Sequence, residues 1–258
     1  VWGYEHIARN FYASCRSYGI VSGNQIIKSY YDDRGDITLL THGNGRLVSP
    51  AYSNPGAHEQ WAFVVTENSN KELLSTDNDI PKDVKIYRNG SLVPFSDYST
   101  QKRVLNYSTL TKLSSYDNAA LSCKLALECT SDGIIKRCLE VHPKTPKTVS
   151  LSIYIPTRAN CTAITIKCAN GKELSLSPRN NHRISSIKVS SIDCSFGSYG
   201  FTTKFTGLPM NEFNIAVTPP NKWEWDLGRG PVVRLFCKVL LRKDSVVTFK
   251  TETSFSGN

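Results

Sequence analysis

An alternation of apolar and polar residues over positions 149–155 constrains the fold of this chain more than any other feature. The odd positions are Val, Leu, Ile and Ile, and the even positions are Ser, Ser and Tyr. Side chains of a β-strand point alternately to its two faces, so this period of two predicts a strand with one apolar and one polar face. Pro156 lacks a backbone N–H, and we expect the strand to end there.

A second alternating run, at residues 164–168, leads into Asn170-Gly171 and a third apolar–polar segment. A two-residue loop would place the apolar faces of the two runs on opposite sides. A three-residue loop over 169–171, with Gly171 in the left-handed region, instead pairs Ile166 with Leu174 and aligns the two faces. We therefore expect a type I turn with a bulge at Gly171.

A further hairpin is expected at residues 84–95, VKIYRNGSLVPF, where a two-residue Asn89-Gly90 turn of type I′ would pair Ile86 with Val93. The same alternation recurs at residues 184–192, 213–217 and 233–241, and helix signals are few. The predicted fold class is all-β, with disulfide-stapled sandwich-like or barrel-like sheets and little helix.

Residues 142–147, HPKTPK, contain two prolines and two lysines and are the best candidate for a stiff linker. They divide the chain into two predicted modules. Residues 1–141 are rich in aromatic side chains and are interpreted as a lectin-like recognition module. Residues 148–258 are interpreted as a module of antiparallel strands rich in Ser and Thr.

The eight cysteines are an even number and contain no C-x-x-C pair, so their spacing excludes a zinc site of the common kind and favours disulfides formed in an oxidising compartment. The disulfide candidates are Cys15, Cys123, Cys129, Cys138, Cys161, Cys168, Cys194 and Cys237. The N-glycosylation candidates are Asn89, Asn106 and Asn160. Both features predict a secreted, extracellular protein, and the opening at Val1 is interpreted as that of a mature product.

The net charge of +9 favours attraction to an anionic surface. The basic residues occur as isolated pairs without a basic stripe, so nucleic acid is not the expected partner. We expect a target-cell surface instead, recognised through a glycan or an anionic lipid.

Motifs of known catalytic sites are missing from the sequence. It contains no G-x-S-x-G, and the H-E-x-x-H pattern that begins at His58 has Ala62 in place of the second histidine. No pair of carboxylates stands out. The sequence therefore predicts a protein that is not an enzyme and needs no metal or cofactor; two acids, or an acid and a histidine, converging in one cleft would contradict this.

Two indoles and two acids lie in a segment bounded by prolines and glycines: Trp223, Glu224, Trp225 and Asp226. Such a segment can stack on a sugar ring and bind its hydroxyls, or lie at a membrane interface. The alternative is that one or both tryptophans anchor the segment in the core.

An aromatic-rich first half followed by Ser/Thr-alternating strands resembles the aerolysin-type β-pore-forming toxins, and the cysteines and sequons resemble those of secreted fungal killer toxins. The resemblance implies a homo-oligomer in which a hairpin within 148–176 or 184–206 inserts into a membrane. Residues 11–47, with Phe11, Ser14 and Cys15, more faintly resemble a cyanovirin-type lectin half-repeat. The alternatives are a non-inserting lectin or adhesin, and a viral or parasite surface glycoprotein.

Overall fold

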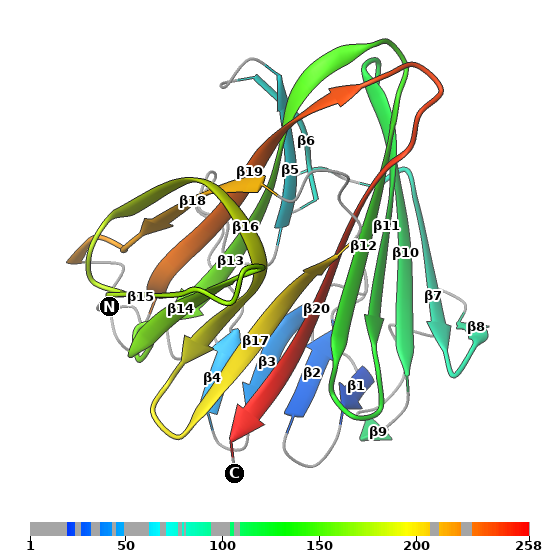
Figure 1. The fold of residues 1–258 in the computed structure, drawn as a ribbon. Helices are drawn as coiled ribbons and strands as arrows, with labels where there is room; N and C mark the ends of the chain where they lie inside the picture. Colours follow the sequence, from blue (N-terminus) through cyan, green and yellow to red (C-terminus); the bar gives the residue numbers. More distant parts are fainter. Residues whose placement is uncertain are drawn as a thin grey trace.

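The computed structural model describes residues 20–23, 27–31, 37–42, 45–48, 62–67, 71–76, 79, 81–93, 104–105, 109–206, 212–222 and 229–257. Nearly all of these residues lie in β-strands, as Figure 1 shows, and the predicted all-β class is confirmed.

A small sheet holds the first strands of the chain, in the order β4-β3-β2-β1-β9. Its strands are β1 (Ile20–Gly23), β2 (Ile27–Tyr31), β3 (Ile37–His42), β4 (Gly45–Val48) and β9 (Val104–Leu105). Strand β1 pairs with β9 in parallel, and the other pairs are antiparallel.

A large antiparallel sheet holds the other fifteen described strands, in the order β6-β5-β13-β19-β18-β16-β17-β20-β12-β11-β10-β7-β8, with β14 beside β16 and β15 beside β14. The first of these strands along the chain are β5 (Ala62–Glu67), β6 (Lys71–Ser75), β7 (Asp83–Arg88), β8 (Ser91–Val93), β10 (Leu110–Asp117), β11 (Leu121–Cys129) and β12 (Ile135–Pro143). The later strands are β13 (Lys147–Arg158), β14 (Ala163–Cys168), β15 (Glu173–Leu176), β16 (His182–Ser195), β17 (Tyr199–Thr206), β18 (Glu212–Thr218), β19 (Arg229–Leu241) and β20 (Val247–Gly257).

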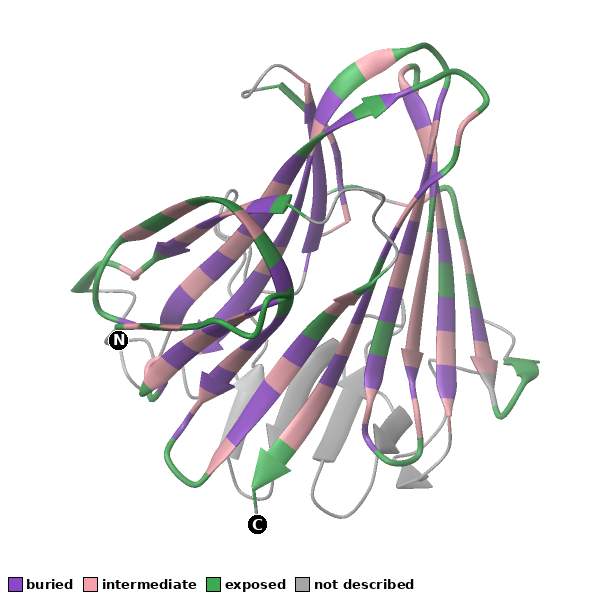
Figure 2. Cartoon of the chain, viewed as in Figure 1, coloured by how far each residue is buried: buried purple, intermediate pink, exposed green. Residues whose placement is uncertain are grey.

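The core lies between strands that are distant in the sheet order. Phe63 on β5 meets Phe249 on β20 with ring centroids 5.3 Å apart, and Phe213 on β18 stacks on Phe249 at 6.1 Å. The large sheet therefore curls until its two halves face each other as the layers of a sandwich. Buried and exposed bands alternate along most strands in Figure 2, as the period of two in the sequence predicts.

Strand β13 confirms the alternating run at residues 149–155, but the prediction that Pro156 ends the strand is wrong. Pro156 still pairs with Val232 on β19, and the register shifts between Pro156 and Arg158. A local irregularity of this kind lets a strand contain a proline although the ring removes one hydrogen-bond donor.

Both predicted hairpins are confirmed. Ile166 pairs with Leu174, and Gly171 has a φ of 82°, as a three-residue loop with a left-handed glycine requires. In the second hairpin, Ile86 pairs with Val93, and the φ values of Asn89 and Gly90 are both positive. Positive φ at both central residues is the signature of a type I′ turn.

The segment predicted as a linker contains the end of β12 and the start of β13. His142 and Pro143 lie within β12, and β13 begins at Lys147. Strands from both sides of this segment belong to the one large sheet. The division into two modules at 142–147 stays a prediction.

The disulfide staples are not supported. No disulfide joins any of the seven cysteines that the structure describes: Cys123, Cys129, Cys138, Cys161, Cys168, Cys194 and Cys237. Cys15 lies outside the described residues. Most of the seven occupy core-facing positions of strands, where a thiol packs as a small apolar side chain, and an even count of cysteines does not reveal this role.

Candidate functional site

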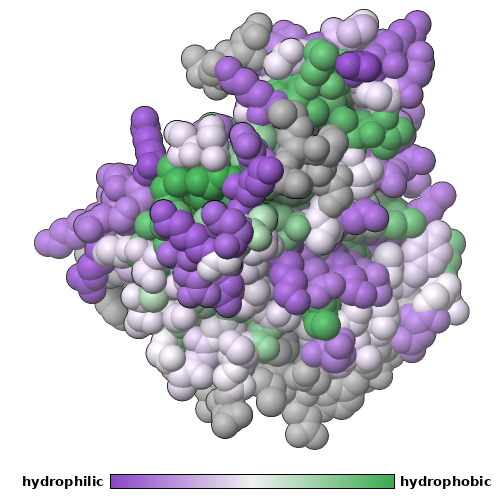
Figure 3. Space-filling model, in the orientation of Figure 1, coloured by the Kyte–Doolittle hydropathy of each residue, from purple (hydrophilic) through white to green (hydrophobic). Residues whose placement is uncertain are grey.

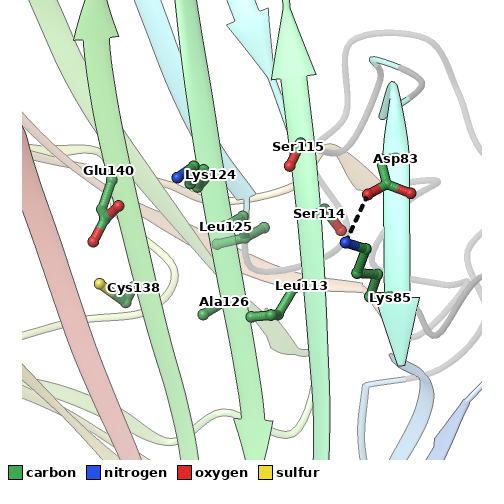
Figure 4. Close-up of a pocket in the computed structure, with 10 residues that line it drawn as sticks. All are labelled: Asp83, Lys85, Leu113, Ser114, Ser115, Lys124, Leu125, Ala126, Cys138 and Glu140. Carbon is green, nitrogen blue, oxygen red and sulfur yellow. Dashed lines mark ion pairs between the residues drawn. The ribbon is translucent and has the colours of Figure 1, made fainter. Parts of the chain in front are cut away.

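The candidate site is a groove of about 340 Å³ across four neighbouring strands, β7, β10, β11 and β12 (Figure 4). This volume lies within the range of small-molecule pockets, roughly 300–1,000 Å³. In-register pairing aligns one residue from each strand in a row across the groove: Asp83, Ser115, Lys124 and Glu140.

A second row lies two residues away along each strand, on the same face of the sheet. It consists of Lys85, Leu113, Ala126 and Cys138. Leu113 and Ala126 give this row an apolar centre between polar ends. The short side chains of Ser115 and Ala126 leave space between the long ones, which is why a sheet face is hollowed here. The groove therefore offers both polar partners and a small apolar floor.

An acid in the lining of the groove has a histidine next to it on the same strand. Glu140 lines the groove, and His142 follows two residues later on β12, so both side chains project from the same face of the strand. Nε2 of His142 lies 3.9 Å from Oε2 of Glu140. This Nε2 atom is buried and has no hydrogen-bond partner among the described residues. The two groups form a side-chain pair that can exchange protons with a bound ligand.

Charged residues at both ends of the groove lie in contact with solvent. Nζ of Lys85 is 3.8 Å from Oδ2 of Asp83, and both side chains are more than half exposed, so the pair contributes little to stability. Beyond His142, Nζ of Lys144 is 2.7 Å from Oδ1 of Asp117. The hydrogen bond from Lys144 lowers the pKa of Asp117, so this carboxylate is ionised at neutral pH.

Cys138 lies across the sheet row from Ala126 and is half-buried. Burial raises the pKa of its thiol above the ordinary value. A thiol that stays protonated at neutral pH is a weak nucleophile. The Glu140 carboxylate and the neighbouring His142 imidazole are groups that can take part in proton transfer.

The structure brings together residues that the sequence analysis did not select. His142 was missed because it lies in the segment interpreted as a linker, and Glu140 was missed because no pair of carboxylates stood out in the sequence. The alternation of core-facing Leu139 and Val141 with Glu140 and His142 was the signal that places both polar groups on one face.

The sequence-predicted sugar or membrane contacts, Trp223, Glu224, Trp225 and Asp226, lie outside the described residues, as does the sequon at Asn106. Asn89 is exposed in its turn, and Nδ2 of Asn160 donates a hydrogen bond of 2.8 Å to the Tyr199 hydroxyl.

No group of three or more His, Cys, Asp or Glu side chains that could hold a metal ion occurs among the residues that the structure describes. A search of the same residues for helices long and apolar enough to cross a membrane found none.

Comparisons with known proteins found likeness in structure alone. No family model and no curated protein matches the sequence. A galactose mutarotase-like protein from Lactobacillus casei matches 92% of this chain and 99% of its own, with a TM-score of 0.56 and 11% identity. A putative aldose 1-epimerase from Escherichia coli K12 matches 92% of this chain over 98% of its own length, with a TM-score of 0.52 and 10% identity. A polysaccharide lyase matches 93% of this chain over 33% of its own length, with a TM-score of 0.52 and 11% identity.

These likenesses overturn the predicted pore-forming or killer toxin, the cyanovirin-type lectin, and the expectation that the chain is not an enzyme. Two of the strands assigned to membrane insertion are interior members of the large sheet: β13 pairs with β5 and β19, and β16 pairs with β14, β17 and β18. On the face shown in Figure 3, hydrophobic patches are separated by hydrophilic side chains. The alternating Ser and Thr residues of these strands belong to one face of the sheet. The chain shares its fold with galactose mutarotase-like and aldose 1-epimerase proteins.

Proposed function

We propose that this protein is a carbohydrate-active enzyme that transfers protons at the anomeric centre of a sugar, as an aldose 1-epimerase does. The observation that carries the proposal is that Glu140 lines a groove of monosaccharide size and lies 3.9 Å from His142, the next residue on the same face of β12. The fold shared with an aldose 1-epimerase and a galactose mutarotase-like protein supports the same reaction class.

The reaction needs one base and one acid close together. The base removes the proton of the anomeric hydroxyl while the acid protonates the ring oxygen, so the bond between the anomeric carbon and the ring oxygen breaks and an aldehyde forms. Rotation about the adjacent carbon–carbon bond and ring closure on the other face give the second anomer. Because both oxygens are attached to one carbon, donor and acceptor must lie within a few ångströms of each other.

In this proposal the Glu140 carboxylate is the base and the His142 imidazolium is the acid. Each has to come within about 2.6–3.2 Å of its oxygen in the complex, which a separation of 3.9 Å between the two groups permits. Ring closure returns both protons, so the pair is restored after each turnover.

The remaining groove residues bind the sugar. Ser115 and Lys124 offer hydrogen-bonding groups to hydroxyls, and Leu113 and Ala126 offer an apolar surface to the C–H face of the ring. Trp223, Glu224, Trp225 and Asp226 remain proposed sugar contacts because stacked indoles and carboxylates suit the same ligand.

The test is the rate of anomer interconversion, followed by NMR exchange spectroscopy and by polarimetry of freshly dissolved α-D-glucose and α-D-galactose. The wild-type protein should exceed the buffer rate for at least one sugar. Glu140→Gln and His142→Asn should each lower kcat/KM by about a hundredfold or more, the usual contribution of a general acid or base. Glu173→Gln, on exposed β15, is the matched control and should keep full activity.

Two results would contradict the proposal in different ways. Buffer-level rates across a panel of aldoses and sugar phosphates would exclude the reaction class. Full activity in both Glu140→Gln and His142→Asn, with thermal unfolding unchanged, would be consistent with the proposed reaction class but would exclude the groove as its site. Trp223→Ala and Glu224→Gln, measured in parallel, would then test the alternative segment.

A further inference from the structure

Two cysteines meet at the turn that joins β13 to β14. The backbone N–H of Cys161 donates to the Arg158 carbonyl at 2.9 Å, which closes the turn, and the N–H of Thr162 donates to the Ser195 carbonyl at 2.8 Å. Ser195 pairs with Ala163, so its neighbour Cys194 lies beside the same turn. The side chains of Cys161 and Cys194 are in hydrogen-bond contact.

The two thiols differ in chemical character. The hydrogen bond from Cys194 lowers the pKa of Cys161, and the same contact, with burial, raises the pKa of Cys194 well above the ordinary value. Cys161 is therefore the more acidic of the two thiols. Isolated buried cysteines behave differently, because burial alone raises the pKa of Cys123 to about 12 and that of Cys237 to about 11.

The two thiols also differ in access. Cys161 is 5% exposed and lines a surface hollow of about 470 Å³, whereas Cys194 is 1% exposed and does not line the hollow. Arg179 lines the same hollow and adds a permanent positive charge there. A cysteine of lowered pKa that lines a hollow beside an arginine, with a second thiol in contact with it, has the arrangement of a reactive cysteine and its resolving partner.

We propose that Cys161 and Cys194 form an oxidisable dithiol that reacts with small hydroperoxides through the hollow. The Cys161 thiolate attacks the O–O bond, taking an OH group to become a sulfenic acid, and the displaced alkoxide or hydroxide takes up a proton. The Cys194 sulfur then attacks the sulfenic sulfur, and water leaves as the disulfide forms. With hydrogen peroxide, two thiols and one peroxide give one disulfide and two waters.

The product would connect two segments that the reduced protein holds only by hydrogen bonds. A disulfide would tie the turn at residues 159–162 to the end of β16. The reaction is independent of the proposed sugar chemistry, because the groove lies on β7, β10, β11 and β12.

The test is peptide mapping by mass spectrometry. Reduced full-length protein is treated with one to ten equivalents of hydrogen peroxide, its remaining thiols are alkylated, and it is digested with trypsin. Trypsin separates residues 159–167, which contain Cys161, from residues 189–204, which contain Cys194, and from Cys168. We expect these two peptides to be joined first, at least ten times faster than any disulfide that includes Cys123 or Cys237.

A variant isolates the first step. In Cys194→Ser the sulfenic acid on Cys161 has no resolving thiol, so dimedone should label residues 159–167. Cys123→Ser is the matched control and should leave the rate of disulfide formation unchanged. Uniform oxidation of all cysteines, a different first pair, or no mass loss in the wild-type protein would overturn the proposal, and the wild-type mapping decides this even if a variant fails to fold.

Discussion

The rings of Phe63 and Phe249 meet edge to face, with centroids 5.3 Å apart, although their strands β5 and β20 are not neighbours in the sheet. Both side chains are almost fully buried. The contact joins the two halves of the curled sheet, so it reports directly on whether the sandwich has closed.

Phe249→Ala should lower the free energy of unfolding by about 3–5 kcal/mol, because it removes a buried ring and leaves a cavity between the layers. Urea unfolding followed by circular dichroism measures this loss. Leu240→Ala is the control: Leu240 is 57% exposed, and its truncation should change stability by no more than about 0.5 kcal/mol. Equal losses in the two variants would contradict the assignment of Phe249 to the core.

Asn118 connects strands from the two ends of the large sheet, because it follows β10 and its partner Leu73 lies on β6. Its Nδ2 donates to the Leu73 carbonyl at 2.7 Å, and its Oδ1 accepts from the N–H groups of Ala120 and Leu121. Asn118→Ala should lower the free energy of unfolding by about 1–3 kcal/mol, because partly buried backbone groups lose their partners.

The same urea titration of Asn180→Ala gives the comparison for Asn118. The Asn180 side chain is exposed, and its loss should leave the midpoint unchanged. A wild-type midpoint for Asn118→Ala would show that water replaces all three hydrogen bonds.

Lys167 should make stability sensitive to alkaline pH. Its Nζ is 2.8 Å from Oδ2 of Asp193 across the β14–β16 pair, and this hydrogen bond raises the pKa of Lys167 above 10.5. A raised pKa in the folded state means that the contribution is fully present below the unfolded value and is lost as the pH rises through the folded value. Urea unfolding between pH 8 and 12 should therefore show a steeper alkaline loss for wild type than for Lys167→Met. Parallel curves would exclude this pair as the cause.

Cys138 allows covalent chemistry in the groove to be distinguished from proton transfer. Burial raises the pKa of its thiol, so at neutral pH it should react slowly with iodoacetamide. Cys138→Ser should keep anomer interconversion within about twofold of wild type, because this thiol takes no part in the proposed acid–base step. Loss of activity in a folded Cys138→Ser protein would point to a nucleophilic cysteine instead.

Local hydrogen-bonding patterns were readable from the sequence alone. The hairpins at Gly171 and at Asn89-Gly90, including the pairings of Ile166 with Leu174 and of Ile86 with Val93, follow from alternation and turn chemistry within a dozen residues. The all-β class follows in the same way, because each run carries its own period of two.

The sheet order and the site could not be read in that way. The pairing of β12 with β20, and the contact of β5 with β20, join segments separated by more than a hundred residues, and strand periodicity carries no information about which strands become neighbours. The prolines in residues 142–147 favoured a linker, although the alternation of apolar and polar residues continues as far as His142. For this reason the sequence analysis did not place His142 beside Glu140.

The sequence by itself thus determined the alternating runs, their two faces and the two tight turns, since these depend on backbone sterics and on the polarity of residues close in the chain. Tertiary structure decided that the Ser/Thr-rich strands join one large curled sheet, that a row of side chains from four strands forms a groove, and that Cys161 lies against Cys194. These are relationships between distant segments, and only the packing of the whole sheet fixes them.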